Sequence, residues 1–133
     1  HLVCTEQLSR HLGFKVGEKL IRVVRVRSLN GNARQVDHGY FLASIAKGLT
    51  PEIAADSIYG YLEHKRGVKV MASRRTVSVE LANDEDCSYL DLGKYNCVAV
   101  MESQSYTSDG ILFEVTHTRT HPEIFHYRVN SKR

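Results

Sequence analysis

Two arginines separated by one residue offer the clearest chemistry in this sequence. We expect residues 19–29 to form a strand, and alternation along it places Arg25 and Arg27 on one face and Val24 on the other. Two neighbouring guanidiniums are suited to a phosphate or carboxylate, because each offers rigid donors that match the geometry of such oxygens. The alternative is a solvent-facing strand surface that binds no ligand.

Ser57 is a second candidate, because it stands at the start of a predicted helix, SIYGYLEHKR, that ends at Gly67. Free N–H groups and the positive end of the helix dipole favour an anion at such a start, and a serine hydroxyl can extend that site. Capping of the helix explains the serine fully without any ligand. Thr5 is a similar case at an earlier helix, which Gly13 ends.

The local patterns of common catalytic and metal sites are absent from the sequence. It contains no Gly-rich phosphate loop, no nucleophile elbow, and no Ser/His/Asp or Cys/His grouping in a recognisable local context. The three cysteines include no CxxC pair, which indicates reduced thiols. We assign His117, His121 and His126 to a strand, where four residues span about 13 Å, too far for shared ligands. We therefore expect no metal, no cofactor and no enzymatic activity.

Composition indicates one globular domain over residues 1–133. Hydrophobic residues make up 42% and charged residues 25% of the chain, which is enough for one core. No apolar run approaches the roughly 18 residues of a membrane span, and no signal segment opens the chain, so we expect a cytoplasmic protein. The net charge is only +3 and the basic residues are dispersed, so we do not expect these residues to grip DNA.

The elements that must hold the candidate side chains alternate β-hairpins with short helices. Residue patterns predict strands over residues 19–29, 33–42, 69–82, 96–107 and 112–120, and an edge strand over residues 125–129. Turns at Asn30-Gly31 and Asp109-Gly110 join the two hairpins. Helices are predicted to begin at Thr5, at Thr50, at Asp56 or Ser57, and at Asn83. Because hairpin partners are antiparallel, we expect an α+β fold with a single antiparallel sheet and helices packed on it.

Together these pieces resemble the effector domain, called UTRA, of the HutC-type GntR transcriptional regulators. The resemblance covers residues 16–127 and follows the family order: the Arg-x-Arg strand, an acid on the returning strand, a Ser-Ile-Tyr helix start, a Leu-rich short helix, and a Tyr-x-x-Asp-Gly hairpin before a Glu. The segments SIYGYLE and NDEDCSYLDL look particularly like members that sense a disaccharide phosphate. The connection from Gly13 to Lys19 is shorter than is usual in the family.

The resemblance implies a chorismate-lyase-like fold, a homodimer and a small-molecule effector. In the complete regulator it implies a preceding winged helix-turn-helix that binds operator DNA and is not among these 133 residues. In relatives that sense sugar phosphates, the Arg-x-Arg pair and the helix-start serine hold the phosphate, and these positions correspond to Arg25, Arg27 and Ser57. The other candidate effector contacts are Tyr59, Asp37, Glu114, Thr5 and Thr120, the last standing where some relatives carry an aromatic residue.

Four functions remain open on the sequence. The leading one is a sensor that binds a phosphorylated sugar and shifts a dimer between states that fit the operator differently. The same arginines could instead read a carboxylate such as an amino acid or a fatty acid. An enzyme of the chorismate-lyase type and a purely structural dimerisation domain are the others. For the dimer, we expect the alternating apolar residues at 98–101 and 113–115 to meet a partner.

Overall fold

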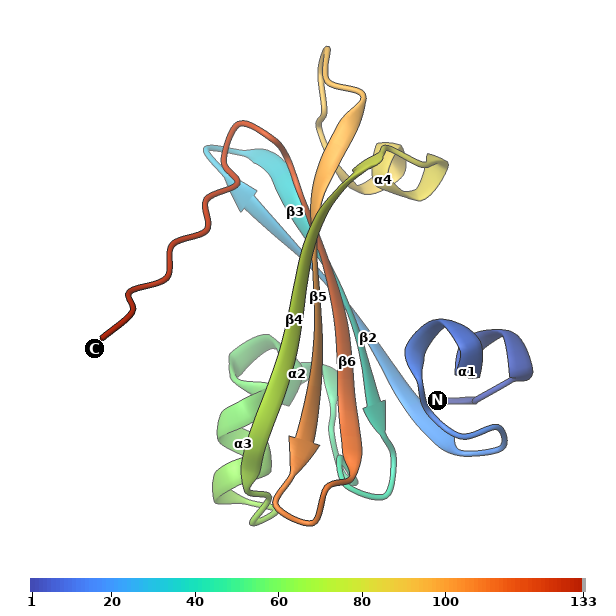
Figure 1. The fold of residues 1–133 in the computed structure, drawn as a ribbon. Coiled ribbons are helices and arrows are strands. Elements are labelled where there is room, and N and C mark those ends of the chain that lie inside the picture. The colour runs from blue at the N-terminus through green and yellow to red at the C-terminus, as the bar shows by residue number, and fades with distance from the viewer. Residues whose placement is uncertain (133) are drawn as a thin grey trace.

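A six-stranded antiparallel sheet in the order β1-β2-β3-β6-β5-β4 organises the computed structural model, which describes residues 1–132 (Figure 1). The α+β prediction with a single antiparallel sheet is therefore confirmed. The two-residue strand β1 was not predicted, because two residues are too few to show alternation. The strands are β1 (Leu2–Val3), β2 (Lys19–Leu29), β3 (Asn32–Leu42), β4 (Val70–Leu81), β5 (Cys97–Thr107) and β6 (Leu112–Thr120).

The first hairpin forms where its turn residues predict it. Asn30 and Gly31 have φ angles of 52° and 82°, the positive values that a two-residue hairpin turn requires at both central positions. The turn pairs Leu29 with Asn32 and Ser28 with Ala33. A bulge between Arg27 and Ser28 then shifts the register by one residue, and this shift places Arg25 directly opposite Asp37.

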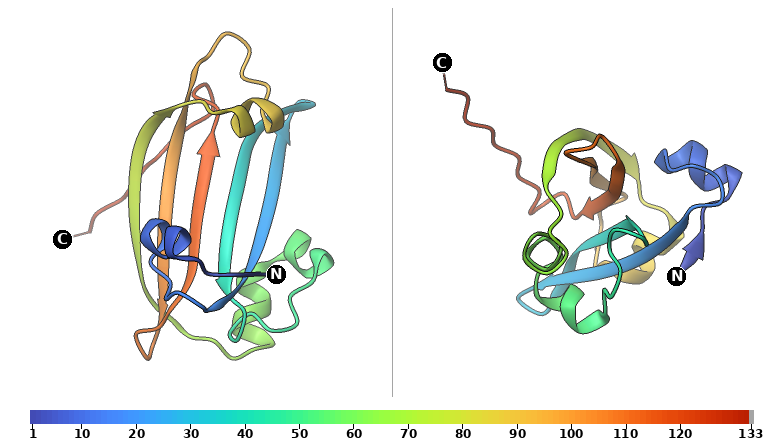
Figure 2. Two further views of the ribbon diagram at one scale, coloured as in Figure 1. Left: turned by 90° about the vertical axis from the view of Figure 1, so that its right-hand side faces the viewer. Right: turned by 90° about the horizontal axis from the view of Figure 1, so that it is seen from below.

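Four short helices cover the two faces of the sheet. They are α1 (Glu6–Leu12), α2 (Pro51–Asp56), α3 (Ile58–His64) and α4 (Asp84–Tyr89). Each begins at a predicted cap, because the side chain of Thr5, Thr50, Ser57 or Asn83 accepts a backbone N–H of the first turn. Of the two caps predicted for α3, Ser57 rather than Asp56 is the one that forms. Figures 1 and 2 show α2 and α3 on one side of the sheet, here called the α3 face, and α1 and α4 on the other, the α1 face. No helix within residues 1–132 is long and apolar enough to span a bilayer.

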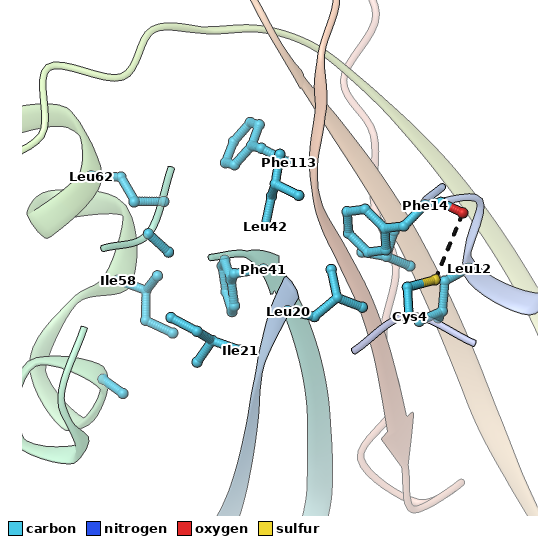
Figure 3. Close-up of a cluster of buried hydrophobic side chains, with 13 residues drawn as sticks. Cys4, Leu12, Phe14, Leu20, Ile21, Phe41, Leu42, Ile58, Leu62 and Phe113 are labelled. Carbon is cyan, nitrogen blue, oxygen red and sulfur yellow. Dashed lines mark hydrogen bonds between the residues drawn. The ribbon is translucent and has the colours of Figure 1, made fainter. Parts of the chain in front are cut away.

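Apolar side chains fill the spaces between the helices and the sheet. Near one end of the sheet, Ile58 and Leu62 of α3 pack with Phe41, while Leu12 of α1 packs with Leu20 (Figure 3). At the other end, a second cluster on the α1 face joins the sheet to the segment after α4, through Val36, Val98, Val100, Leu90 and Leu92. Val98, Val100, Phe113 and Val115 are thus buried in the chain's own cores. The expectation that residues 98–101 and 113–115 meet a partner is therefore wrong.

The predicted edge strand over residues 125–129 is also wrong. Residues 125–132 belong to no helix or strand and extend away from the sheet after β6 (Figure 1). A strand needs a neighbour for its backbone groups, and residues 125–132 pair with no strand of the described part of the chain. Within residues 1–132, the outer edge of β4 also has no paired strand.

The short connection between α1 and β2 is an ordered turn. Gly13 adopts a φ of 98° and ends α1, and Gly17 donates its N–H to the carbonyl of Cys4 at 2.8 Å. The N–H of Cys4 in turn donates to the carbonyl of Glu18. These hydrogen bonds hold β1 against β2, so the short connection joins α1 to β2 directly.

Candidate functional site

The α3 face of the sheet gathers five of the eight predicted effector residues. Register pairs Arg25 of β2 with Asp37 of β3, and Asp37 with Thr118 of β6. Because side chains alternate along a strand, residues two, four or six positions from these lie on the same face. This places Arg25, Arg27, Asp37, Glu114 and Thr120 on the face that α3 covers.

Arg25 and Asp37 form an ion pair across neighbouring strands. Arg25 Nη2 donates to Asp37 Oδ2 at 2.8 Å, and Thr118 Oγ1 donates to the other carboxylate oxygen at 3.2 Å. Within residues 1–132 this is the only side-chain hydrogen bond of Arg25, so most of its five N–H donors are left for a ligand. The pair therefore holds the guanidinium in position without using up its donors.

Arg27 lies on the same face and is exposed. It forms no ion pair or side-chain hydrogen bond with another of residues 1–132. Arg25 and Arg27 both precede the bulge, in the regularly paired part of β2, so alternation keeps them on one face. Arg27 can therefore approach an anion from solvent.

A buried carboxylate, Glu114, lies at the other end of this face. It is only 4% exposed, and it accepts hydrogen bonds from the hydroxyls of Tyr59 and Ser105, the latter at 3.1 Å. The Tyr59 and Ser105 hydroxyl oxygens are themselves 3.2 Å apart. Helix α3 brings Tyr59 over the sheet, because burial of Ile58 and Leu62 fixes the side of the helix that faces the strands. We call Tyr59, Ser105 and Glu114 the carboxylate cluster.

Burial dominates the ionisation of the carboxylate cluster. Desolvation raises the pKa of Glu114, and the bonds from Tyr59 and Ser105 lower it in part. The negative charge of Asp37 adds to the rise, whereas Arg25 opposes it. Desolvation and the bond to Glu114 raise the pKa of Tyr59 to about 12. The phenol of Tyr59 thus stays a donor near neutral pH.

Replacing Glu114 by Gln should change the pH dependence of stability. The pKa of Glu114 is raised in the fold, so its contribution is complete below the unfolded pKa of about 4.3 and is lost as pH rises through the folded pKa. The parent should therefore lose free energy of unfolding relative to Glu114→Gln as pH rises. Urea denaturation of both proteins from acid to neutral pH measures this difference in the free energy of unfolding. Glu63→Gln is the control, because Glu63 lies on the exposed side of α3. A flat difference, or one of opposite slope, would contradict the assignment.

Ser57 lies apart from Arg25. Its hydroxyl accepts the N–H of Gly60 at 3.0 Å, as an N-cap does, and it lines a cavity of about 480 Å³ with Tyr61 and Lys65. Arg25 lines a different cavity, of about 460 Å³, beside α2. The structure thus does not bring Ser57 and Arg25 together in one cavity.

Two more predicted residues lie away from the carboxylate cluster. Thr5 caps α1, which packs on the α1 face, so the sheet separates it from the other candidates (Figure 2). Thr120 is on the α3 face but six residues beyond Glu114, about 20 Å along the strand. It accepts a hydrogen bond from Gln35 at 3.0 Å. Thr120 is thus half of a cross-strand pair with Gln35, and this contact explains its burial without a ligand.

The sequence reasoning missed Ser105, Thr118 and Gly39. The Asp109-Gly110 turn pairs Ser105 with Glu114, and Thr118 is four residues after Glu114 on the same face, so strand register could have identified both. Gly39 lies between Asp37 and Phe41, and a Cβ there would approach the Phe41 ring to 2.9 Å. No local pattern predicts this crowding, because it depends on how the Phe41 side chain turns.

The histidines do not share a strand. Only His117 lies in β6, while His121 follows it and His126 is in the unpaired segment, so their assignment to one strand is wrong. Among residues 1–132 no three His, Cys, Asp or Glu side chains are grouped so that they could hold a metal ion. The α3 face instead combines a positioned guanidinium, two carboxylates and several hydroxyls. Such a set can bind an anionic group next to a hydroxyl-rich body.

Comparison with known proteins places the chain in a family. The model of the UTRA domain matches residues 2–126. The chain is 28% identical over 123 residues to the HTH-type transcriptional regulator TreR of Bacillus subtilis, covering 92% of this chain and 52% of that protein. It is 31% identical over 88 residues to the uncharacterized regulator YydK of the same organism, covering 66% and 37%. The chain thus spans about half or less of the length of these curated relatives.

Solved structures agree with this placement. The effector-binding domain of the B. subtilis trehalose repressor superposes with a TM-score of 0.89 at 27% identity, covering 97% of this chain and 90% of that one. The regulator YydK gives 0.86 at 25% identity, with coverage of 98% and 57%. A GntR-family regulator from Bacillus cereus, at 23% identity, shares the fold with a TM-score of 0.87. The protein therefore belongs to the UTRA family and is similar to the effector-binding domains of GntR-family transcriptional regulators.

Proposed function

We propose that this chain is the ligand-sensing domain of a transcriptional regulator and that it binds a small phosphorylated sugar. The observation that carries the proposal is the pairing of Arg25 with Asp37 on the face that also holds the buried Glu114. A held guanidinium with free donors suits a phosphate. Carboxylate oxygens that lack a cation suit the hydroxyl donors of a sugar.

The similarity to a trehalose repressor's effector-binding domain supports a sugar-related ligand. We further propose that the rest of the regulator carries the DNA-binding domain and acts in the cytoplasm, since the curated relatives are HTH-type regulators about twice the length of this chain. The working unit is a homodimer whose two arrangements bind the operator unequally. An effector changes operator binding only by its preference for one arrangement, and such couplings are typically about 1–3 kcal/mol.

A carboxylate ligand is the second candidate, because the surroundings of Arg25 are largely apolar. The cavity beside it is lined by Ile21, Val23, Leu49 and Ala54. An amino acid or a fatty acid could place its carboxylate at Arg25 and its apolar part against these side chains. A carboxylate ligand of this kind would not contact Glu114. Substitution of Glu114 should therefore affect binding of a sugar phosphate but not of a carboxylate.

Titration calorimetry with matched ligands tests the proposal. We expect a disaccharide or hexose phosphate to bind, and the same sugar without its phosphate to bind at least about tenfold more weakly, because charged hydrogen bonds to the phosphate contribute roughly 1.5–3 kcal/mol. Inorganic phosphate alone should bind weakly. Equal affinity for sugar and sugar phosphate, or binding of carboxylates only, would overturn the sugar-phosphate assignment.

A further inference from the structure

A row of small residues crosses the middle of the α3 face, between the pair of Arg25 with Asp37 and the carboxylate cluster. Strand register pairs Gly39 of β3 with Thr116 of β6, and Thr116 with Ser103 of β5. Thr116 and Ser103 are half-buried, so this part of the face is partly open to solvent. Side chains this small leave room for a ligand to lie across the three strands.

Arg75 of β4 continues this row beyond Ser103. The two residues pair across β4 and β5, so their side chains lie on the same face of the sheet, the α3 face. Arg75 is exposed. It forms no ion pair and no side-chain hydrogen bond with another of residues 1–132, so all five of its N–H donors are left for a ligand.

The guanidinium of Arg75 lies near the carboxylate cluster. Ser105 of the cluster is two residues from Ser103 on β5, and such a diagonal neighbour is about 7–8 Å away, within reach of a long side chain. The charge of Arg75 also acts on the Tyr59 hydroxyl. Burial and a hydrogen bond within the cluster raise the pKa of Tyr59 to about 12, and Arg75 opposes this rise.

The positive charge of Arg75 has no partner of the kind that Asp37 provides for Arg25. Glu114 accepts hydrogen bonds from the hydroxyls of the cluster and forms no ion pair with Arg75 within residues 1–132. Burial also raises the pKa of Glu114, so its carboxyl group carries less negative charge than an exposed glutamate would at the same pH. An unpaired guanidinium beside a partly desolvated surface favours an anion.

We propose that Arg75 binds a second anionic group of the effector, which makes the ligand a sugar with two acidic groups, such as a sugar bisphosphate. The proposal rests on the proposed function, in which Arg25 holds a sugar's phosphate, and it adds a charged group at the opposite end of that ligand. The two arginines stand on β2 and β4, four strand spacings or about 19 Å apart on a flat sheet. Two long side chains that reach inward reduce this gap to one that a sugar bisphosphate spans.

The row between the two arginines suits the body of a sugar. The hydroxyls of Thr116 and Ser103 form no side-chain hydrogen bond within residues 1–132, so both are left to pair with sugar hydroxyls. Glu114 and the other hydroxyls of the carboxylate cluster border the same row. The α3 face thus offers a guanidinium at each end and hydroxyl partners between them.

Titration calorimetry with matched sugars tests the second anionic group. The pairs are glucose 6-phosphate with glucose 1,6-bisphosphate, and fructose 6-phosphate with fructose 1,6-bisphosphate. We expect at least one bisphosphate to bind at least about tenfold more tightly than its monophosphate, because it gains charged hydrogen bonds to Arg75. Arg75→Gln should remove this preference and leave the affinity for the monophosphate within about twofold. Arg75→Lys should keep part of the preference, since it retains the charge but not the fork of donors.

Arg74→Gln is the matched control for Arg75. Arg74 is the preceding residue of β4 and is also exposed, but it pairs with Gln104 on the α1 face. Its substitution removes the same charge from the same strand and should leave both affinities unchanged. Circular dichroism checks that each variant is folded.

The outcomes separate this inference from the proposed function. If none of the four sugars binds, both are overturned. If the monophosphates bind and neither bisphosphate binds more tightly, the second anionic group alone is overturned. A preference that survives Arg75→Gln places that group at another cation, such as Arg27, and overturns the role of Arg75. An equal loss in Arg74→Gln would show a general effect of charge and would also overturn it.

Discussion

Asp86→Ala should lower the free energy of unfolding by about 3–5 kcal/mol, the usual cost of removing one partner of a buried ion pair. Asp86 is 1% exposed, and its two carboxylate oxygens accept Arg119 Nε at 2.7 Å and Arg119 Nη2 at 2.9 Å. Without the carboxylate, a largely buried guanidinium would keep only its bond to Glu80. Asp86 also accepts the N–H of Asn83 in the capping box of α4, so the start of this helix is weakened as well.

Urea denaturation followed by circular dichroism measures this loss. Asp84→Ala is the matched control, because Asp84 lies in the first turn of the same helix but is exposed, and its change should be below about 1 kcal/mol. The double variant Asp86→Ala, Arg119→Met should recover a large part of the loss, since no buried charge is left unpaired. If Asp86→Ala unfolds as the Asp84 control does, the pair does not hold α4 on the sheet.

Arg25→Ala should weaken binding of a sugar phosphate about 10- to 100-fold while leaving the fold intact. Arg25 lies on the α3 face with its guanidinium held by Asp37 and its remaining donors free, so its loss removes hydrogen bonds to a charged group. Such bonds contribute roughly 1.5–3 kcal/mol. Titration calorimetry of the parent and the variant with the same sugar phosphate gives the ratio of dissociation constants.

Arg34→Ala provides the control for Arg25. Arg34 is on the neighbouring strand β3 but on the α1 face, where its Nη1 donates to the carbonyl of Asp91 at 3.2 Å, and it does not line the cavity beside Arg25. Its removal should leave effector binding unchanged. Asp37→Asn should weaken binding less than Arg25→Ala, because it releases the guanidinium without removing it. A variant lacking Arg25 that binds as tightly as the parent would place the ligand elsewhere.

Local sequence determined most of the elements, because their causes are local. The β2–β3 hairpin follows from alternation around Asn30-Gly31, where positive φ is cheap, and the helix starts follow from caps that accept neighbouring N–H groups. Alternation also placed Arg25 and Arg27 on one face before any fold was known. The resemblance to the UTRA family came from the order of these same local patterns, and the family match bears it out.

Tertiary structure decided which of these pieces meet. The sheet order sets Glu114 beside Ser105 and brings Tyr59 onto both, and the same order puts Thr5 on the opposite face. The pair of Asp86 and Arg119 joins residues 33 positions apart, so no window of sequence could show it. Residues 125–129 have the alternation of a strand yet form none, because alternation prepares two faces but only a neighbouring strand can satisfy the backbone. Periodicity is a property of the chain, whereas contact depends on where the other strands lie.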